Sequence, residues 1–271
     1  MMTAVLGMAA LAAMGQNARD ILTLPAPAYD ERIAYGPDAN QFADLRLPQG
    51  AGLHPVVVVI HGGYWRAAYG LEYAGHMSAA LTRRGFATWN IEYRRIGQPG
   101  GGYPGTLEDA GRAVDQLRQI AAAKKLDLGR VTLLGHSAGG HLALWVAGRE
   151  RPAVRVGAVV SLAGVSDLGM LYERKLGNGV ALELMGCAPA DCAGKYRDAS
   201  PVERLPLSVR VTMVHGDKDD IVPFAMSEAF VRKAGSGARL LRLEGAGHFE
   251  MVDPRRAEWK TVEELITKSA H

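Results

Sequence analysis

The sequence predicts an α/β fold in which helices flank a mostly parallel central sheet. Strand-like runs alternate with helix-length segments from Pro55 onward, which is the pattern of a parallel sheet with crossover helices. Pro55–Ile60 is an unbroken β-branched run, typical of a strand covered on both faces. A glycine-rich turn, Gly135–Gly139, stands directly between a strand-like run and a helix-like run.

The elements follow one another in a regular order. Two short exposed strands, Arg32–Pro37 and Phe42–Leu47, are expected first, around an Asp/Ala/Asn turn. The strands expected after them are Pro55–Ile60, Phe86–Tyr93, Arg130–Leu134, Val156–Ala163, Val209–Val214 and Ala238–Leu243. The expected helices are Leu71–Arg84, a long helix capped by Thr106, Ala138–Arg149, Phe224–Ala234 and Glu258–Lys268.

One stretch, Ser166–Leu205, interrupts this alternation with short helical pieces. We predict that it is a small insertion over the carboxyl edge of the sheet, where ligands bind in open α/β sheets. The chain has no internal repeat and no low-complexity linker, so residues 30–271 are expected to form a single domain.

The composition is that of a globular protein. The 271 residues are 48% hydrophobic and 22% charged, which excludes a disordered chain. The formal net charge is +3, from 31 Lys+Arg and 28 Asp+Glu, without a block of five like charges. A nucleic-acid partner is therefore not expected.

The N-terminus has the character of a leader. Met1–Ala18 is uncharged, and Thr3–Met14 is an apolar run too short to span a bilayer. Ala13-Met14-Gly15 resembles a cleavage site for a signal peptidase, although no Lys or Arg precedes the apolar run. We expect residues 1–18 to be a leader of an exported protein, periplasmic or secreted, without stable membrane insertion; the alternative is a cytoplasmic protein.

The two cysteines bear on the same question. Cys187 and Cys192 lie close together in a Gly/Ala/Pro-rich loop, so they either form a disulfide in an oxidising compartment or remain free thiols. A zinc site is not expected, because no second cysteine pair or spaced histidine pair accompanies them.

The turn Gly135-His136-Ser137-Ala138-Gly139 fits G-x-S-x-G. A serine on such a sharp turn has a strained backbone, and side chains two residues away would collide, which explains the glycines. The turn holds the hydroxyl clear of the sheet at a helix N-terminus. Ser137 is thereby a candidate nucleophile, which requires a base.

Candidate partners follow Ser137 in the chain. His248 stands on a glycine loop after the last expected strand, and it is the candidate base, although a single loop histidine is more often solvated. Asp217, Asp219 and Asp220 follow the preceding strand, and any of the three is a candidate to orient that histidine.

The loop His61-Gly62-Gly63-Tyr64-Trp65 follows the buried strand Pro55–Ile60. Its glycines allow the N–H groups of Gly62 and Gly63 to donate to an oxyanion beside the N–H of Ala138. The alternative is an ordinary β-to-α turn that needs glycine for a positive φ.

Together these motifs resemble the α/β-hydrolase superfamily over roughly residues 30–270. The matching segments are His61–Trp65, Gly135–Gly140, His215–Pro223 and Gly245–His248. The H-G-G-x-W loop looks like that of the arylformamidase (kynurenine formamidase) and small-esterase branch. The resemblance implies that Asp219 is the catalytic acid, that Ser137, Asp219 and His248 form a triad, and that neither a metal nor an organic cofactor is needed.

Aromatic residues in the loops near this edge are candidates for a substrate wall. They are Tyr64, Trp65, Tyr69 and Tyr103. The alternative for Trp65 is a role in packing beneath the loop. We interpret His141 as structural and Glu92-Tyr93-Arg94-Arg95 as a salt-bridged loop anchor.

These observations favour a serine hydrolase acting on small carboxylic esters through an acyl-enzyme. The alternatives are an arylformamidase acting on N-formylkynurenine-like formamides and, more remotely, a non-catalytic binding protein of the same fold. A nucleotide site is not expected, because His141 stands where a phosphate loop requires lysine and no G-x-G-x-x-G follows the first core strand.

Overall fold

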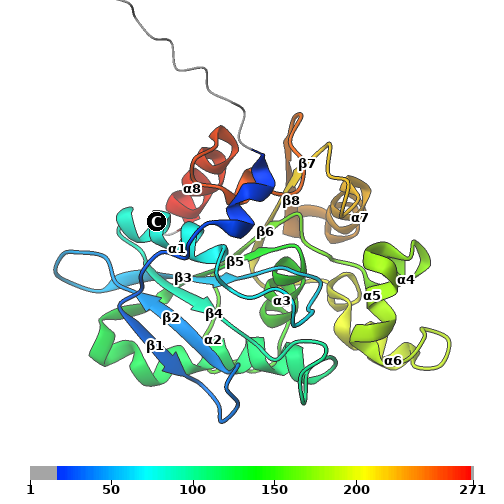
Figure 1. Ribbon diagram of the computed structural model, residues 1–271, viewed down its shortest axis with the longest axis horizontal. Coiled ribbons are helices and arrows are strands. Elements are labelled where there is room, and N and C mark those ends of the chain that lie inside the picture. The colour runs from blue at the N-terminus through cyan, green and yellow to red at the C-terminus, as the bar shows by residue number, and fades with distance from the viewer. Residues whose placement is uncertain (1–16, 270–271) are drawn as a thin grey trace, which may run out of the picture.

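The structure is a computed structural model, and it describes residues 17–269. The predicted leader lies outside the described residues except for its last two positions. One sheet of eight strands runs through the protein in the order β1-β2-β4-β3-β5-β6-β7-β8 (Figure 1). The strands are β1 (Glu31–Ala34), β2 (Phe42–Arg46), β3 (His54–Ile60), β4 (Ala87–Ile91), β5 (Leu126–His136), β6 (Ala158–Leu162), β7 (Arg210–Gly216) and β8 (Ala238–Leu243).

The sheet is mostly parallel, as predicted. Strand β2 pairs antiparallel with β1 and β4, and all other neighbours are parallel. The α-helices are α1 (Ala74–Arg83), α2 (Gly105–Lys124), α3 (Ala138–Ala147), α4 (Leu168–Glu173), α5 (Leu176–Met185), α6 (Ala193–Ala199), α7 (Phe224–Ala234) and α8 (Ala257–Ser269). Short 3-10 helices are η1 (Ala18–Thr23), η2 (Pro201–Arg204), η3 (Gly235–Gly237) and η4 (Glu250–Val252).

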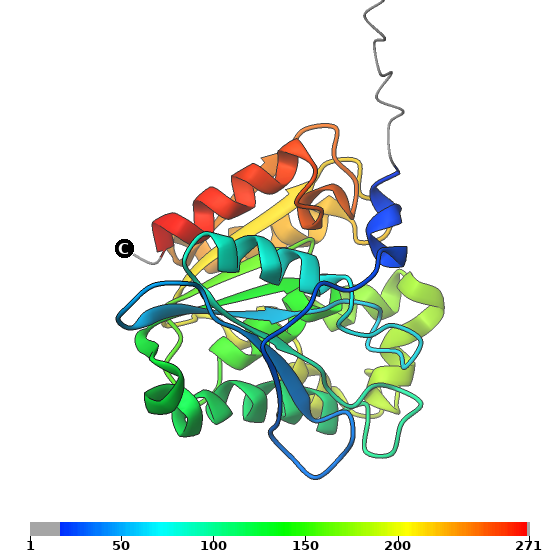
Figure 2. The same ribbon diagram turned by 60° about the vertical axis from the view of Figure 1, so that its left-hand side comes forward.

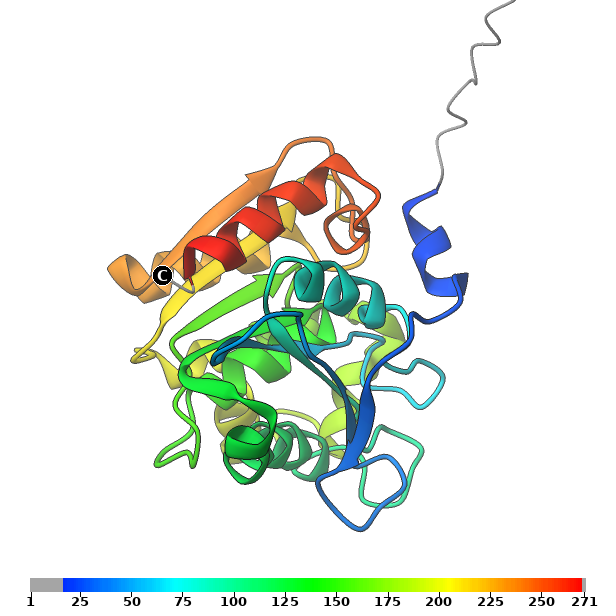
Figure 3. The same ribbon diagram turned by 90° about the vertical axis from the view of Figure 1, so that its left-hand side faces the viewer.

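Helices cover both faces of the sheet. Figure 2 and Figure 3 show α1 and α8 on one face and α2 on the other. Strand β3 shows why its sequence is apolar without interruption: Val56 and Val58 belong to one core cluster, and Val57 and Val59 to the other. A strand buried on both faces has no position for a polar side chain, so the prediction from its β-branched run is confirmed.

Two local predictions are wrong. The strand predicted at Phe42–Leu47 is not exposed, because β2 lies between β1 and β4 and residues 43–46 are buried. Thr106 does not cap α2, which begins one residue earlier. Its hydroxyl accepts a hydrogen bond from Gly102 N and donates one to the carbonyl of Arg94, so it joins two loops instead.

The interruption at residues 166–205 forms α4, α5, α6 and η2. These elements contact the loops that follow β3 and β4: Arg66 forms an ion pair with Glu183, and Tyr103 N donates to the carbonyl of Leu184. The insertion therefore lies at the carboxyl ends of the parallel strands, as predicted. Between α5 and α6, Cys187 and Cys192 are joined by a disulfide.

Before the sheet, the turn η1 packs back onto the domain. Ile21 is fully buried in the same core cluster as residues of α1 and α8. Among the described residues, no helix is both long and apolar enough to cross a bilayer.

Candidate active site

Ser137 stands between β5 and α3 with φ 56° and ψ −118°, a conformation that non-glycine residues rarely adopt. The neighbouring glycines allow this turn. A Cβ on Gly135 would lie 2.1 Å from the carbonyl oxygen of Gly139, and one on Gly139 would lie 2.1 Å from that of Ile60. The tight strand-to-helix turn predicted from G-x-S-x-G is thus present, and Ser137, which is 5% exposed, lines a cavity.

Asp219 and His248 form a buried pair. The Nδ1 of His248 lies 2.6 Å from Oδ2 of Asp219, and Oδ1 accepts from the N–H groups of Ile221 at 2.8 Å and Val222 at 2.9 Å. Burial alone would raise the pKa of Asp219. Hydrogen bonds from His215, His248 and Val222 N outweigh burial and hold this pKa well below its usual value, so the carboxylate is ionised.

A glycine contact brings these two loops together. A Cβ on Gly216, at the end of β7, would lie 2.2 Å from the carbonyl oxygen of Ala246 and 2.4 Å from that of Gly247. Only glycine permits this approach, which places the loop after β7 directly against the loop that carries His248.

The competing aspartates have other partners. Asp217 accepts from Arg242 and from Gly245 N, which ties the same two loops together from outside. The carboxylate of Asp220 faces solvent and lies 3.5 Å from Arg19. Of the three acids, Asp219 is the one in contact with His248.

Ser137 and His248 open onto one cavity of about 310 Å³. No hydrogen bond between their side chains is present in the described part of the chain. Catalytic hydrogen bonds of this kind often tighten only when substrate is bound. The cavity is lined by Arg19, Leu22, Gly63, Tyr64, Tyr69, Tyr73, His136, Ser137, Ile221, His248 and Phe249.

The loop after β3 reaches Ser137 closely. A Cβ on Gly62 would lie 2.9 Å from the Cβ of Ser137. However, the N–H of Gly62 donates to the hydroxyl of Tyr73 at 2.7 Å and is not free for an oxyanion. The amides of Gly63 and Ala138 have no hydrogen-bond partner among residues 17–269, and these two remain as candidate oxyanion donors.

Tyr73 belongs to a relay that the sequence did not reveal. Its hydroxyl lies 2.7 Å from Nδ1 of His136, whose Nε2 lies 3.0 Å from the carbonyl oxygen of His248. A carbonyl only accepts, so the His136 proton is on Nε2 and Nδ1 accepts from Tyr73. Burial lowers the pKa of His136 well below its usual value, which keeps this ring neutral. The relay joins the backbone of Gly62 to the backbone of His248.

A second missed histidine supports Asp219. His215 is fully buried, with Nδ1 2.7 Å from the hydroxyl of Ser227 and Nε2 3.1 Å from Oδ2 of Asp219. It is the first residue of the H-G-x-x-D pattern, so its position in that motif was the available signal. His215 contacts Oδ2 of this carboxylate, whereas the N–H groups of Ile221 and Val222 donate to Oδ1.

The loop anchor predicted at Glu92–Arg95 is confirmed. Glu92 Oε1 lies 2.9 Å from Nε2 of His61 and 3.4 Å from Arg95, and Arg94 pairs with the buried Asp109 at 2.7 Å. Burial opposes ionisation of Glu92, but its contacts with His61 and Arg95 hold its pKa below the usual value. These pairs fix the start of the His61–Trp65 loop.

Two of the four aromatic residues predicted as a substrate wall line the cavity. Tyr64 and Tyr69 line the cavity, but Trp65 and Tyr103 do not. Trp65 is 1% exposed and packs edge-on against His141, with ring centroids 5.1 Å apart, so its role is packing. The hydroxyl of Tyr103 is directed to Asp198, at 3.0 Å.

His141 is structural, as we interpreted it. Its Nε2 lies 2.9 Å from the carbonyl oxygen of Ala199, and burial lowers its pKa to about 4.

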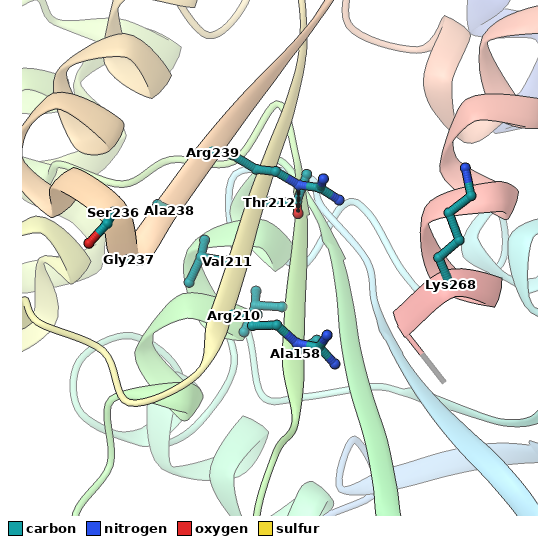
Figure 4. A pocket seen from close by; sticks show the side chains of 10 residues that line it. Ala158, Arg210, Val211, Thr212, Ser236, Gly237, Ala238, Arg239 and Lys268 are labelled. Atoms are coloured by element: carbon teal, nitrogen blue, oxygen red, sulfur yellow. Dashed lines mark hydrogen bonds between the residues drawn. The ribbon is translucent and has the colours of Figure 1, made fainter. Parts of the chain in front are cut away.

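Another hollow lies at the amino ends of the parallel strands, where β6, β7 and β8 begin. Figure 4 shows Arg210, Arg239 and Lys268 around it, with Arg239 beside Thr212. This hollow has no nucleophile paired with a base and lies at the opposite edge of the sheet from Ser137. Within residues 17–269, no cluster of three His, Cys, Asp or Glu side chains could hold a metal ion.

Comparison with known proteins places the chain in a family. The model of the BD-FAE family matches residues 43–234, which include β3, the Ser137 turn and the Asp219 loop. The chain belongs to the BD-FAE family. The matched residues of this chain end at residue 234, before β8 and His248.

Curated relatives are esterases by name. The chain is 27% identical over 264 residues to a probable isoprenylcysteine α-carbonyl methylesterase of Oryza sativa subsp. japonica, covering 87% of this chain and 62% of that protein. It is 28% identical over 198 residues to the esterase LipQ of Mycobacterium tuberculosis, covering 67% of this chain and 47% of LipQ. The chain thus spans between about half and two thirds of the length of these relatives.

Solved structures show the same fold. A truncated carbohydrate esterase from gut microbiota has a TM-score of 0.75 at 22% identity, covering 90% of this chain and 99% of that one. The propionate-bound esterase Est2 of Thermogutta terrifontis has a TM-score of 0.71 at 21% identity, covering 88% and 92%. The fold is therefore that of the α/β hydrolases, as the motifs predicted.

Proposed function

We propose that this protein is a serine esterase that cleaves small carboxylic esters through an acyl-enzyme. The observation that carries the proposal is the Asp219–His248 pair, which opens onto the same cavity as Ser137 on its strained turn. The esterase names of the relatives support the same class of reaction.

In the proposed mechanism, Ser137 Oγ attacks the ester carbonyl while Nε2 of His248 takes its proton. The Asp219 carboxylate keeps the proton of neutral His248 on Nδ1, which leaves Nε2 free to act as the base. It also stabilises the imidazolium that forms. The N–H groups of Gly63 and Ala138 donate to the oxyanion. His248 then protonates the departing alcohol, and water hydrolyses the acyl-enzyme by the same sequence of proton transfers.

Substrate rates test this proposal. We expect kcat/KM on 4-nitrophenyl acetate or butyrate to exceed that on N-formylkynurenine, and both rates to fall at least 10⁴-fold in Ser137→Ala, by analogy with other triads. 4-Nitrophenyl octanoate measures the length of acyl chain that the cavity accepts. A formamide rate far above every ester rate would replace the esterase proposal with the arylformamidase alternative, which rests on the His61–Trp65 loop.

We also propose that the protein is exported. The disulfide between Cys187 and Cys192 supports this, because such bonds persist in oxidising compartments. We expect the full chain, expressed in a bacterium, to appear in the periplasm with its N-terminal residues removed and the disulfide intact by mass. Recovery of the uncleaved, reduced chain from the cytoplasm would contradict export.

A further inference from the structure

The turn η1 forms one wall of the cavity that holds Ser137. Arg19 and Leu22 line this cavity, although more than one hundred residues separate them from Ser137 in the chain. Ile21 between them is fully buried, which anchors the turn to the domain. The helix η1 is therefore placed to contact a substrate bound in this cavity.

Among the described residues that line the cavity, Arg19 carries the one permanent charge. Its guanidinium carbon lies 5.9 Å from the centre of the Phe249 ring, and Phe249 directly follows His248. The acid of the triad, Asp219, is buried, and its Oδ2 is already in contact with His248 and His215. The cavity is thus lined by a cation together with apolar and aromatic side chains.

The partner of Arg19 is held weakly. Its Nη2 lies 3.5 Å from Oδ2 of Asp220, and the two side chains are 56% and 72% exposed. An exposed ion pair of this length contributes little to stability, so an incoming carboxylate can replace Asp220 at small cost. A guanidinium also forms stronger, charge-assisted hydrogen bonds with carboxylates than with neutral groups.

From these observations we infer that Arg19 is a substrate-binding residue that favours esters carrying a carboxylate, and that Asp220 competes with the substrate for Arg19. The inference rests on the proposed esterase function and adds a substrate class to it. Two opposite effects follow. Removing the charge of Arg19 lowers the preference for an anionic ester, and removing the charge of Asp220 raises it.

The test compares two aryl acetates that differ in charge but deliver the same acyl group. For 3-acetoxybenzoate and neutral 3-acetoxybenzamide, we take the ratio of the two kcat/KM values in each enzyme. Relative to wild type, we expect this ratio to fall about fivefold in Arg19→Gln and to rise in Asp220→Asn, because exposed ion pairs have effects of this order. Added salt should lower the wild-type ratio and leave that of Arg19→Gln nearly unchanged.

Arg84→Gln is the matched control. Arg84 has a side chain of similar exposure in one ion pair, with Glu263, and it does not line the cavity. Its ratio should equal that of wild type. An unchanged ratio in both Arg19→Gln and Asp220→Asn would overturn the inference while leaving esterase activity itself intact.

A binding measurement separates this inference from the proposed function. Binding can be measured in the variant Ser137→Ala, which lacks the nucleophile. We titrate 3-hydroxybenzoate and, separately, 3-hydroxybenzamide into this variant by calorimetry. We expect the benzoate to bind more tightly, and this preference to be lost when Arg19→Gln is added. Equal binding of the two compounds to Ser137→Ala would overturn the subsite even if ester hydrolysis were established, whereas failure to hydrolyse any neutral ester would overturn the proposed function alone.

Discussion

Replacement of Asp219 by asparagine tests the role of the buried carboxylate with almost no change in shape. Oδ1 accepts from two backbone N–H groups, those of Ile221 and Val222. An asparagine must keep its carbonyl oxygen at this position, because an amide NH₂ there would face two donors. The NH₂ group then takes the place of Oδ2, 2.6 Å from Nδ1 of His248.

This exchange reverses the hydrogen bond to His248. Nδ1 must now accept, so the proton moves to Nε2, which can no longer take the proton of Ser137. We expect kcat/KM on 4-nitrophenyl butyrate to fall about 10⁴-fold, the loss caused by the wrong tautomer in a comparable triad. This corresponds to about 5 kcal/mol of transition-state stabilisation.

Asp115→Asn is the control for this variant. Asp115 also accepts from a backbone N–H, that of Ala153, and pairs with an arginine, Arg149, but it does not line the cavity. Its kcat/KM should stay close to wild type. An Asp219→Asn enzyme that keeps more than about a tenth of wild-type kcat/KM would refute the assignment of Asp219.

Three further predictions concern stability and geometry. Tyr73→Phe leaves the N–H of Gly62 and Nδ1 of His136 buried without a partner, so the free energy of unfolding in urea should fall by about 2 kcal/mol or more, and kcat should fall with it. Gly216→Ala introduces a methyl group 2.2 Å from the carbonyl oxygen of Ala246, so it should displace the His248 loop and lower kcat/KM at least tenfold. The pKa of Asp219 is depressed in the folded protein, so its stabilising contribution is complete above the usual carboxyl pKa of about 4 and is lost as the pH falls. As the pH falls from 5 to 3, the free energy of unfolding measured in urea should therefore decrease more steeply for wild type than for Asp219→Asn.

Each of these predictions has its own check. Tyr35→Phe removes a hydroxyl that donates a single hydrogen bond, to the carbonyl of Glu92. It should lower the free energy of unfolding by less than Tyr73→Phe does. If both variants lost the same free energy of unfolding, the hydrogen bonds of Tyr73 would contribute no more to stability than the single bond of Tyr35. Gly237→Ala meets no atom within 4 Å and should be neutral, while full activity of Gly216→Ala would contradict the close approach of the two loops. Parallel acid profiles of wild type and Asp219→Asn would contradict the depressed pKa.

Features set by neighbouring residues could be predicted from the sequence. The Ser137 turn depends on glycines within two residues of it, and strand β3 depends on its own unbroken apolar run. Helix α7 and strand β8 were predicted with their observed bounds for the same reason.

Features set by distant contacts could not be predicted in this way. Three aspartates follow β7, and which one meets His248 depends on the paths of two loops that touch at Gly216. The relay of Tyr73 and His136 joins residues 63 positions apart, and no local pattern records it. In this relay the N–H of Gly62 donates to the hydroxyl of Tyr73, so the sequence could not show that Gly62 is not an oxyanion donor.

The N-terminal wall of the cavity was missed for another reason. Residues 18–23 form a 3-10 helix of six residues, too short for a periodic pattern, and they begin at the last residue of the segment predicted as a leader. Only the folded structure brings Arg19 beside Phe249.

The identity of the nucleophile is the claim on which the proposed function depends most directly. A fluorophosphonate reacts covalently with an activated serine, and the mass of the intact protein counts the adducts. We expect one adduct on wild type, none on Ser137→Ala, and a greatly slowed reaction in His248→Ala. Equal labelling of Ser137→Ala, or no labelling of wild type at all, would contradict the account.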